Sequence, residues 1–169
     1  MYAAGLPRCS VVIADVYKLL SEVPDPEIPI LSIADLGIVR DVVIDGEKVT
    51  VTLTPTYSAC PATEVIEASV YEHLRANGIT DVHVHRALSP PWTTDWISAE
   101  GRRKLAEYGI APPAGSTAKK SLRGDDLRIA CPRCHSTNSV KVSEFGSTPC
   151  KAAYKCGDCL EPFEYFKCI

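Results

Sequence analysis

The sequence predicts an α+β fold, with a small α/β sandwich followed by a C-terminal zinc ribbon. Residues 49–54 alternate with period two and are rich in β-branched side chains, as is typical of a strand. Apolar residues recur every four positions over 66–74, which is typical of one face of a helix. Two C-x2-C pairs within 131–159 offer four thiolates to one metal ion.

The chain of 169 residues is long enough for one ordinary domain and a small accessory one. Its 46% hydrophobic and 23% charged residues are typical of soluble globular proteins. We expect no membrane partner, because no apolar run approaches about 18 residues, and no export signal is recognisable. Six of the eight cysteines crowd the last 39 positions, which favours metal binding in a reducing cytoplasm over a disulfide framework.

Charge is spread unevenly along the chain. The net charge is −3, with −6 over residues 1–115 and +3 over 116–169. A nucleic-acid-binding protein would carry a stronger basic field. We therefore expect protein partners, homo-oligomers among them, and no nucleic acid.

The first elements expected are a helix and a hairpin. An amphipathic pattern predicts a helix over 10–21, with Ser10 as its N-cap, ending before two prolines in 24–27. Strands are expected over 37–44 and 47–54, joined by an Asp-Gly turn at 45–46.

The rest of the first unit alternates helix and strand. A second helix is expected to end at Ala76, a third strand to cover 79–88, and a third helix to cover 98–108 between Ser98 and Gly109. The sequence then turns linker-like, rich in Pro, Gly and Ser. We therefore divide the chain into a domain at 1–110, a linker at 111–125 and a ribbon at 126–169.

One cysteine, Cys60, lies where the second strand ends and the second helix begins. Pro61 suits a first helical turn, and the free N–H groups there favour a thiolate, acting as nucleophile or metal ligand. The alternative is an inert thiol packed as a small apolar side chain. A thiol-dependent enzyme stays open, although no catalytic base is identifiable from the sequence.

The C-terminal pairs predict a structural zinc site. Cys131, Cys134, Cys156 and Cys159 form two knuckles with 21 residues between them, and flanking strands are expected at 126–130, 139–143, 152–154 and 161–167. Zinc suits four sulfurs in a tetrahedron; iron is the alternative. Such a closed site indicates a scaffold or docking role. Two further cysteines are either buried thiols or alternative ligands: Cys150 and Cys168.

Other candidates have two interpretations each. His83 and His85 form either a metal pair or the solvated face of a strand. Trp92 and Trp96 form either a partner-binding surface or a lid on the core. Three acidic residues either help to hold a metal near Cys60 or belong to ordinary turns: Asp25, Glu27 and Asp35.

Residues 25–39, the Thr54-to-Pro61 loop and the Pro-Pro-Trp at 90–92 resemble the small iron–sulfur assembly domain of the SufT group. With the ribbon added, the whole chain is similar to the family of D subunits associated with the bacterial ring-1,2-phenylacetyl-CoA epoxidase. The paired Glu-x-x-His motifs of a di-iron oxygenase are absent from the sequence.

The resemblance implies a non-catalytic accessory or maturation role in phenylacetate catabolism. Its partners would be the di-iron oxygenase and the iron–sulfur flavin reductase, and Cys60 would carry iron or an iron–sulfur cluster transiently, beside structural Zn2+ in the ribbon. The alternative is a purely structural subunit. The residues expected to support Cys60 are Asp25, Glu27, Asp35, Thr54 and Thr56.

Overall fold

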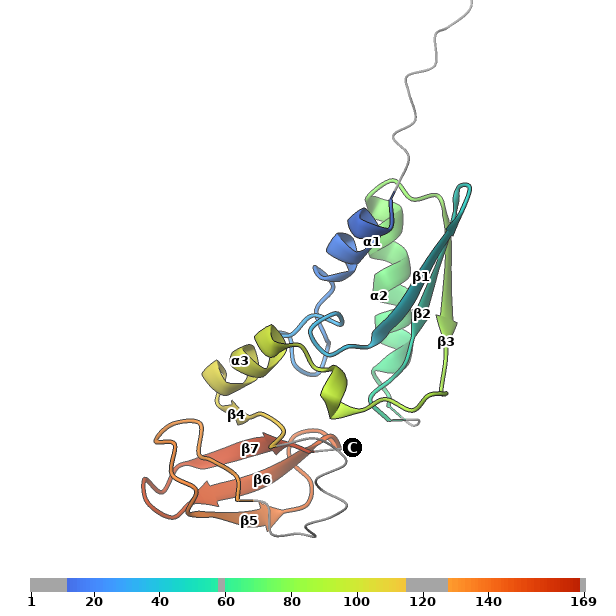
Figure 1. The fold of residues 1–169 in the computed structure, drawn as a ribbon. Coiled ribbons are helices and arrows are strands. Elements are labelled where there is room, and N and C mark those ends of the chain that lie inside the picture. The colour runs from blue at the N-terminus through green and yellow to red at the C-terminus, as the bar shows by residue number, and fades with distance from the viewer. Residues whose placement is uncertain (1–11, 58–59, 115–127, 168–169) are drawn as a thin grey trace, which may run out of the picture.

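The computed structural model describes residues 12–57, 60–114 and 128–167 and has two units stacked end to end (Figure 1). The N-terminal unit is a three-stranded sheet covered by helices, and the C-terminal unit is a small β-sheet. This is the α+β arrangement followed by a β-rich ribbon that the sequence predicts.

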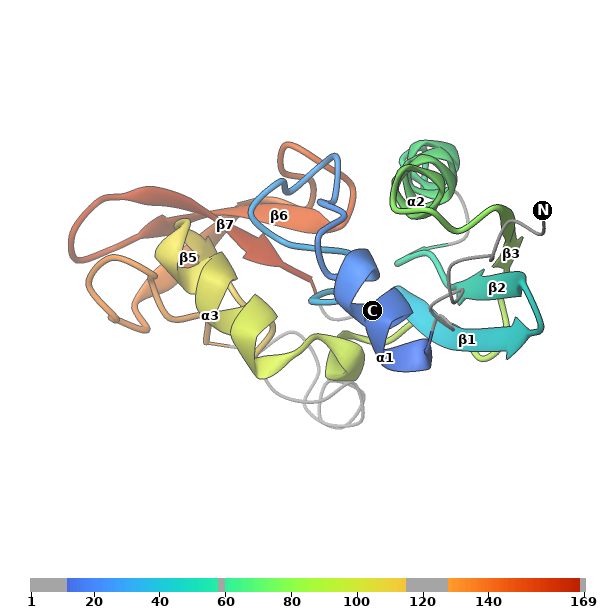
Figure 2. The same ribbon diagram turned by 90° about the horizontal axis from the view of Figure 1, so that it is seen from above.

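The N-terminal sheet has the order β1-β2-β3, made of β1 (Val39–Asp45), β2 (Lys48–Leu53) and β3 (Asp81–Arg86). β1 and β2 are antiparallel and β2 and β3 parallel, so the chain crosses back between the parallel strands through α2 (Thr63–Ala76). α1 (Ile13–Leu20) and α2 lie side by side on one face of the sheet (Figures 1 and 2).

The hairpin turn differs by one residue from its prediction. Asp45 pairs with Lys48, so the two turn residues are Gly46 and Glu47 instead of Asp45 and Gly46. Gly46 has a φ of +61°, the left-handed conformation that a two-residue hairpin turn needs. Aspartate therefore ends the strand, and the glycine opens the turn.

The sheet buries one face and exposes the other. Val49, Val51 and Leu53 alternate inward along β2 and are almost fully buried. On the outer face His83 and His85 of β3 are exposed, and His83 Nε2 lies 2.9 Å from Asp81 Oδ1. This placement favours the solvated-face interpretation of the two histidines.

The helices follow their apolar patterns. Ile66, Val70 and Leu74 form the buried face of α2, as the four-residue spacing predicts. α1 begins at Ile13 with Val12 as its N-cap residue, and the predicted cap Ser10 lies outside the described residues.

A short connection leads from the first unit into the second. It consists of a 3-10 turn η1 (Thr94–Trp96), α3 (Ala99–Glu107) and β4 (Ile110–Ala111). The Ser98 side chain accepts a hydrogen bond of 2.8 Å from Gly101 N–H, so Ser98 is the predicted N-cap of α3.

The C-terminal sheet has the order β4-β7-β6-β5. Its remaining strands are β5 (Ser139–Ser143), β6 (Lys151–Cys156) and β7 (Pro162–Phe166). β4 is parallel to β7, so Ile110 and Ala111 belong to the ribbon sheet where the sequence predicts the start of a linker at 111. The reason is burial, because both side chains are less than 5% exposed. The strand predicted at 126–130 is absent from the described residues 128–130.

One apolar core spans the two units, and a second, smaller cluster lies around the ribbon sheet. Phe166 and Cys150 of the ribbon are buried in the same cluster as the side chains of the N-terminal sheet and helices. The Trp92 ring lies 6.1 Å from the Phe166 ring, and Trp92 Nε1 donates a 2.9 Å hydrogen bond to Leu36 O. Trp92 is 4% exposed, so it is a lid on the core, whereas Trp96 is half-buried under Arg40.

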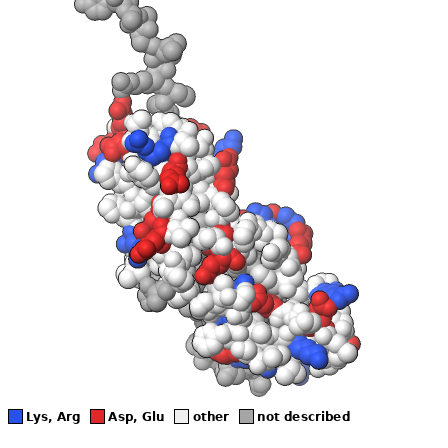
Figure 3. All heavy atoms as spheres, turned by 180° about the vertical axis from the view of Figure 1, so that it is seen from behind, with Lys and Arg blue, Asp and Glu red and all other residues white. Residues whose placement is uncertain are grey.

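No described helix is both long and apolar enough to span a membrane. On the face drawn in Figure 3, the Lys and Arg side chains of the described residues are interspersed with acidic ones and form no continuous basic field. This surface is not of the kind that binds a polyanion.

Candidate functional site

The Cys60 loop joins β2 to α2 on the side of the N-terminal unit that faces the ribbon. Cys60 N–H donates to Tyr57 O over 3.1 Å, and Cys60 O accepts from Thr63 N–H over 3.2 Å. Thr63 Oγ1 adds a 2.9 Å bond to the same carbonyl. α2 begins only at Thr63, so Pro61 precedes the helix and does not occupy its first turn.

Cys60 lines a cavity between the two units. The cavity encloses about 20 Å³, enough for one water-sized occupant. Much of its wall is apolar and includes Leu53 and Phe166. The polar and sulfur-bearing residues that line it are Asp25, Glu27, Thr56, Cys60, Thr63 and Cys150.

The two carboxylates come from the Pro-Asp-Pro-Glu turn. Asp25 Oδ1 accepts the N–H groups of Glu27 at 2.9 Å and Ile28 at 2.7 Å, which fixes the turn. Burial raises the pKa of Asp25 above its ordinary value, against the lowering effect of these two N–H groups. Burial, and next the charge of Asp25, raise the pKa of Glu27.

Two hydroxyl groups near the loop are buried without a hydrogen-bond partner among the described residues: Tyr57 Oη and Thr54 Oγ1. Burial raises the pKa of Tyr57 to about 12, and negative charge on Cys60, Glu27 and Cys150 adds to the shift. Thr54 is 2% exposed at the end of β2, beside the cavity-lining Leu53 and Pro55.

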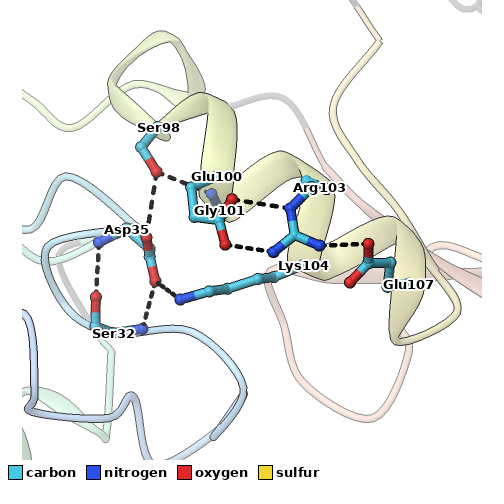
Figure 4. Close-up of polar contacts among 8 residues, drawn as sticks. All are labelled: Ser32, Asp35, Ser98, Glu100, Gly101, Arg103, Lys104 and Glu107. Atoms are coloured by element: carbon cyan, nitrogen blue, oxygen red, sulfur yellow. Dashed lines mark hydrogen bonds and ion pairs between the residues drawn. The ribbon is translucent and has the colours of Figure 1, made fainter.

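Asp35 lies in a different network, shown in Figure 4. Its carboxylate accepts hydrogen bonds from Lys104 Nζ at 2.7 Å, from Ser32 N–H at 3.1 Å and from Ser98 Oγ at 3.3 Å. These contacts tie the 32–37 turn to α3. The structure thus places Asp25, Glu27 and Thr56 around one cavity with Cys60 and does not bring Asp35 there.

Cys150, predicted to be either a buried thiol or an alternative ribbon ligand, is the second thiol of this cavity. It directly precedes β6 and is 3% exposed. Its Sγ lies 3.1 Å from Thr148 Oγ1 and 3.9 Å from Glu27 Oε2. Burial raises the pKa of the Cys150 thiol. Its lack of a C-x2-C partner is the one sequence signal that sets it apart from the ribbon cysteines.

The four paired cysteines of the ribbon converge at the other end of the C-terminal unit. Their sulfurs all lie within 4.8 Å of one another, with 3.7 Å between Cys131 and Cys159 and 3.6 Å between Cys134 and Cys156. A tetrahedral zinc ion with Zn–S bonds of about 2.3 Å separates its sulfurs by about 3.8 Å. The donor set and its spacing therefore fit zinc, held by Cys131, Cys134, Cys156 and Cys159.

Backbone groups favour the thiolate form at this site. N–H groups of Cys159 and Asp158 lower the pKa of the Cys156 thiol to about 7. At Cys159 the Glu161 N–H group also lowers the pKa, but burial and the neighbouring sulfurs outweigh it and raise the pKa to about 12. With four protein sulfurs around the ion no coordination position stays open, so the ion would support the fold and not react.

Comparisons with known proteins agree with this division. Residues 13–85 match the family described as iron-sulfur cluster assembly protein, and residues 115–167 match the PaaD zinc beta ribbon domain. An Escherichia coli (strain K12) protein, named as the putative D subunit of 1,2-phenylacetyl-CoA epoxidase, is 50% identical over 155 residues, which cover 92% of each chain. The chain belongs to the PaaD family.

Two further relatives match about half of this chain. An Fe-S protein maturation auxiliary factor of Porphyromonas gingivalis is 33% identical over 54% of this chain and 88% of its own length. The crystal structure of a DUF59 domain from Bacillus anthracis has 29% identity and a TM-score of 0.52, covering 54% of this chain and 89% of that one. The PaaD family thus joins an iron–sulfur assembly domain to a zinc ribbon.

Proposed function

We propose that this protein is a non-catalytic accessory subunit of a phenylacetyl-CoA epoxidase system, and that it assists the assembly of an iron or iron–sulfur centre in a partner subunit through Cys60. The observation that carries the proposal is the cavity in which the Cys60 thiol and the carboxylates of Asp25 and Glu27 meet. Thiolate and carboxylate together suit iron, a borderline metal that both soft and hard ligands accept.

The similarity to a protein named as a D subunit of the epoxidase, and to proteins named as Fe-S maturation factors, supports both halves of the proposal. Cys60 is half-buried, so a metal held there can be handed on after a small opening, unlike one enclosed by four sulfurs. The ribbon, with its closed cysteine site, would dock the partner subunit.

The test is anaerobic co-expression with the partner subunits, comparing wild type with Cys60→Ser. Iron bound to the partner should fall to the level found without this protein, and growth on phenylacetate should stop. The variant should keep its melting temperature, because a hydroxyl replaces a half-buried thiol of similar size.

Two other roles predict different results. A purely structural subunit would leave partner iron and growth unchanged in Cys60→Ser, while its deletion would dissolve the complex. A thiol-dependent enzyme would lose pathway function with partner iron at wild-type level. The thiol-dependent enzyme is the weaker alternative, because no histidine among the described residues lines the cavity as a general base.

A further inference from the structure

We propose that Cys60 and Cys150, one thiol from each unit, together bind a single divalent cation of the iron class, with Glu27 as the third ligand. The inference deepens the proposed function and rests on it. It assigns to the ribbon a direct share in the metal site, in addition to its own zinc ion.

The first support is convergence. Cys60 and Cys150 are 90 positions apart in the sequence, yet both line one small cavity. Cys150 Sγ lies 3.9 Å from Glu27 Oε2, and Glu27 belongs to the opposite unit. Two thiols and one carboxylate from three separate segments therefore line the same cavity.

The second support is negative charge that has no direct ion-pair partner among the described residues, although the charge of Lys151 lowers the pKa of both carboxyl groups. Asp25 is 6% exposed, and among the described residues its Oδ2 accepts no hydrogen bond. Neither Asp25 nor Glu27 forms an ion pair with a described residue, and the nearby Lys151 Nζ is held by Glu164 at 2.9 Å. Burial raises the pKa of both carboxyl groups. A divalent ion that replaces two thiol protons leaves the net charge of the site unchanged, but it would give the Glu27 carboxylate a direct positive partner.

The third support is the size of the space. A volume of about 20 Å³ accommodates one ion or one water molecule. Two sulfurs and a carboxylate oxygen favour Fe2+ or a similar transition metal over Mg2+ or Ca2+, which prefer oxygen ligands. Binding would displace the protons of the two thiols into solvent.

The test uses the full chain, loaded with zinc and kept anaerobic, titrated with Co2+ as a spectroscopic stand-in for Fe2+. Each thiolate ligand contributes to the sulfur-to-cobalt charge-transfer absorption. Wild type should bind one Co2+ beyond its zinc. Cys60→Ser and Cys150→Ser should each retain roughly half of the absorption per bound cobalt, because one of two sulfurs remains.

Two charge variants distinguish the loss of a metal ligand from the loss of the fold. Glu27→Gln leaves both thiols in place and should weaken Co2+ binding by about tenfold or more. Glu22→Gln is the matched control, since Glu22 is an exposed carboxylate that lies 3.3 Å from His73 on α2, and it should bind Co2+ as wild type does. Retained zinc and an unchanged melting temperature establish that each variant is folded.

The outcomes separate this inference from the proposed function. Wild-type cobalt spectra in Cys150→Ser would overturn the two-thiol site, while a loss of partner iron in Cys60→Ser would still support the maturation role. Normal cobalt binding in both serine variants would overturn the site altogether. A disulfide between Cys60 and Cys150 in protein purified and kept under reducing, anaerobic conditions would also contradict it.

Discussion

At the scale of single residues, the buried charge of Asp25 lowers the stability of the fold but contributes to the proposed metal-binding cavity. Its Oδ1 holds the turn through two backbone N–H groups, while its charge is buried at 6% exposure without an ion pair to a described residue. Asparagine keeps an oxygen for the turn and removes the charge. We predict that Asp25→Asn raises the free energy of unfolding at pH 7 by about 1 kcal/mol and weakens metal binding.

The pH dependence gives this prediction its sign. Because folding raises the pKa of Asp25 above the ordinary 3.8, the wild type is most favoured below that value and loses stability as the pH rises through the folded pKa. Urea denaturation of both proteins should therefore show the greater stability of Asp25→Asn at pH 7 and the loss of that difference near pH 3.5. An equal gain at both pH values would contradict the buried-charge explanation.

Whether the place of a residue in the site can be predicted from the sequence depends on how far apart in the sequence its contacts lie. Asp25, Glu27 and Cys60 stand in local motifs, a Pro-bounded turn and a strand-to-helix loop, so their chemistry is readable from the sequence. Cys150 reaches the same cavity only through the docking of the ribbon, and no local pattern encodes that contact. Asp35 belongs to an equally acidic segment, but its turn directs it toward α3.

At the scale of elements, Asp35 joins the 32–37 turn to α3. Burial alone would raise the pKa of Asp35, but the hydrogen bonds from Lys104 and Ser32 outweigh it and hold the pKa below 3.8. We predict that Asp35→Asn lowers the free energy of unfolding by about 2 kcal/mol at pH 7, the usual worth of a charged hydrogen bond. The difference should be complete above pH 3.8 and vanish as the pH falls through the folded pKa.

Denaturation of wild type and Asp35→Asn across pH 2 to 7 tests this coupling, with Glu107→Gln as control on the same helix. Glu107 pairs with Arg103 at the surface, where an ion pair contributes little. A loss as large in Glu107→Gln as in Asp35→Asn would argue against a specific role for the turn-to-helix contact. Cobalt binding should survive in both variants, because neither residue lines the cavity.

Element boundaries show the same limit of local information. The N-cap Ser98 and the buried stripe of α2 follow from short-range chemistry and agree with the sequence. The two-residue strand β4 was not predicted, because only pairing with β7, more than 50 positions away, makes it a strand. Position 111, where the sequence predicts the start of the linker, therefore lies in a strand.

At the scale of the whole molecule, the ribbon completes the cavity of the other unit. Cys150 and Phe166 provide the ribbon side of the wall, and Phe166 also packs on Trp92. The ribbon has only a small core of its own, so metal ligation by its four cysteines would supply much of its folding free energy. The closed cysteine site and the mixed thiol–carboxylate cavity are thus coupled through the fold.

This coupling predicts that removing zinc from the four-cysteine site also disrupts the Cys60 cavity, which lies elsewhere in the fold. Chelation, or Cys156→Ser, should unfold the ribbon and expose Trp92, which is 4% exposed in the folded chain. Tryptophan emission should shift to longer wavelength, and a Trp96→Phe background assigns that change to Trp92.

Phe166→Ala is the comparison variant: it should keep zinc but loosen the Trp92 contact and weaken Co2+ binding at the cavity. Unchanged Trp92 emission and cobalt binding after complete zinc loss would mean that the ribbon stays docked without its metal and that the two sites are independent.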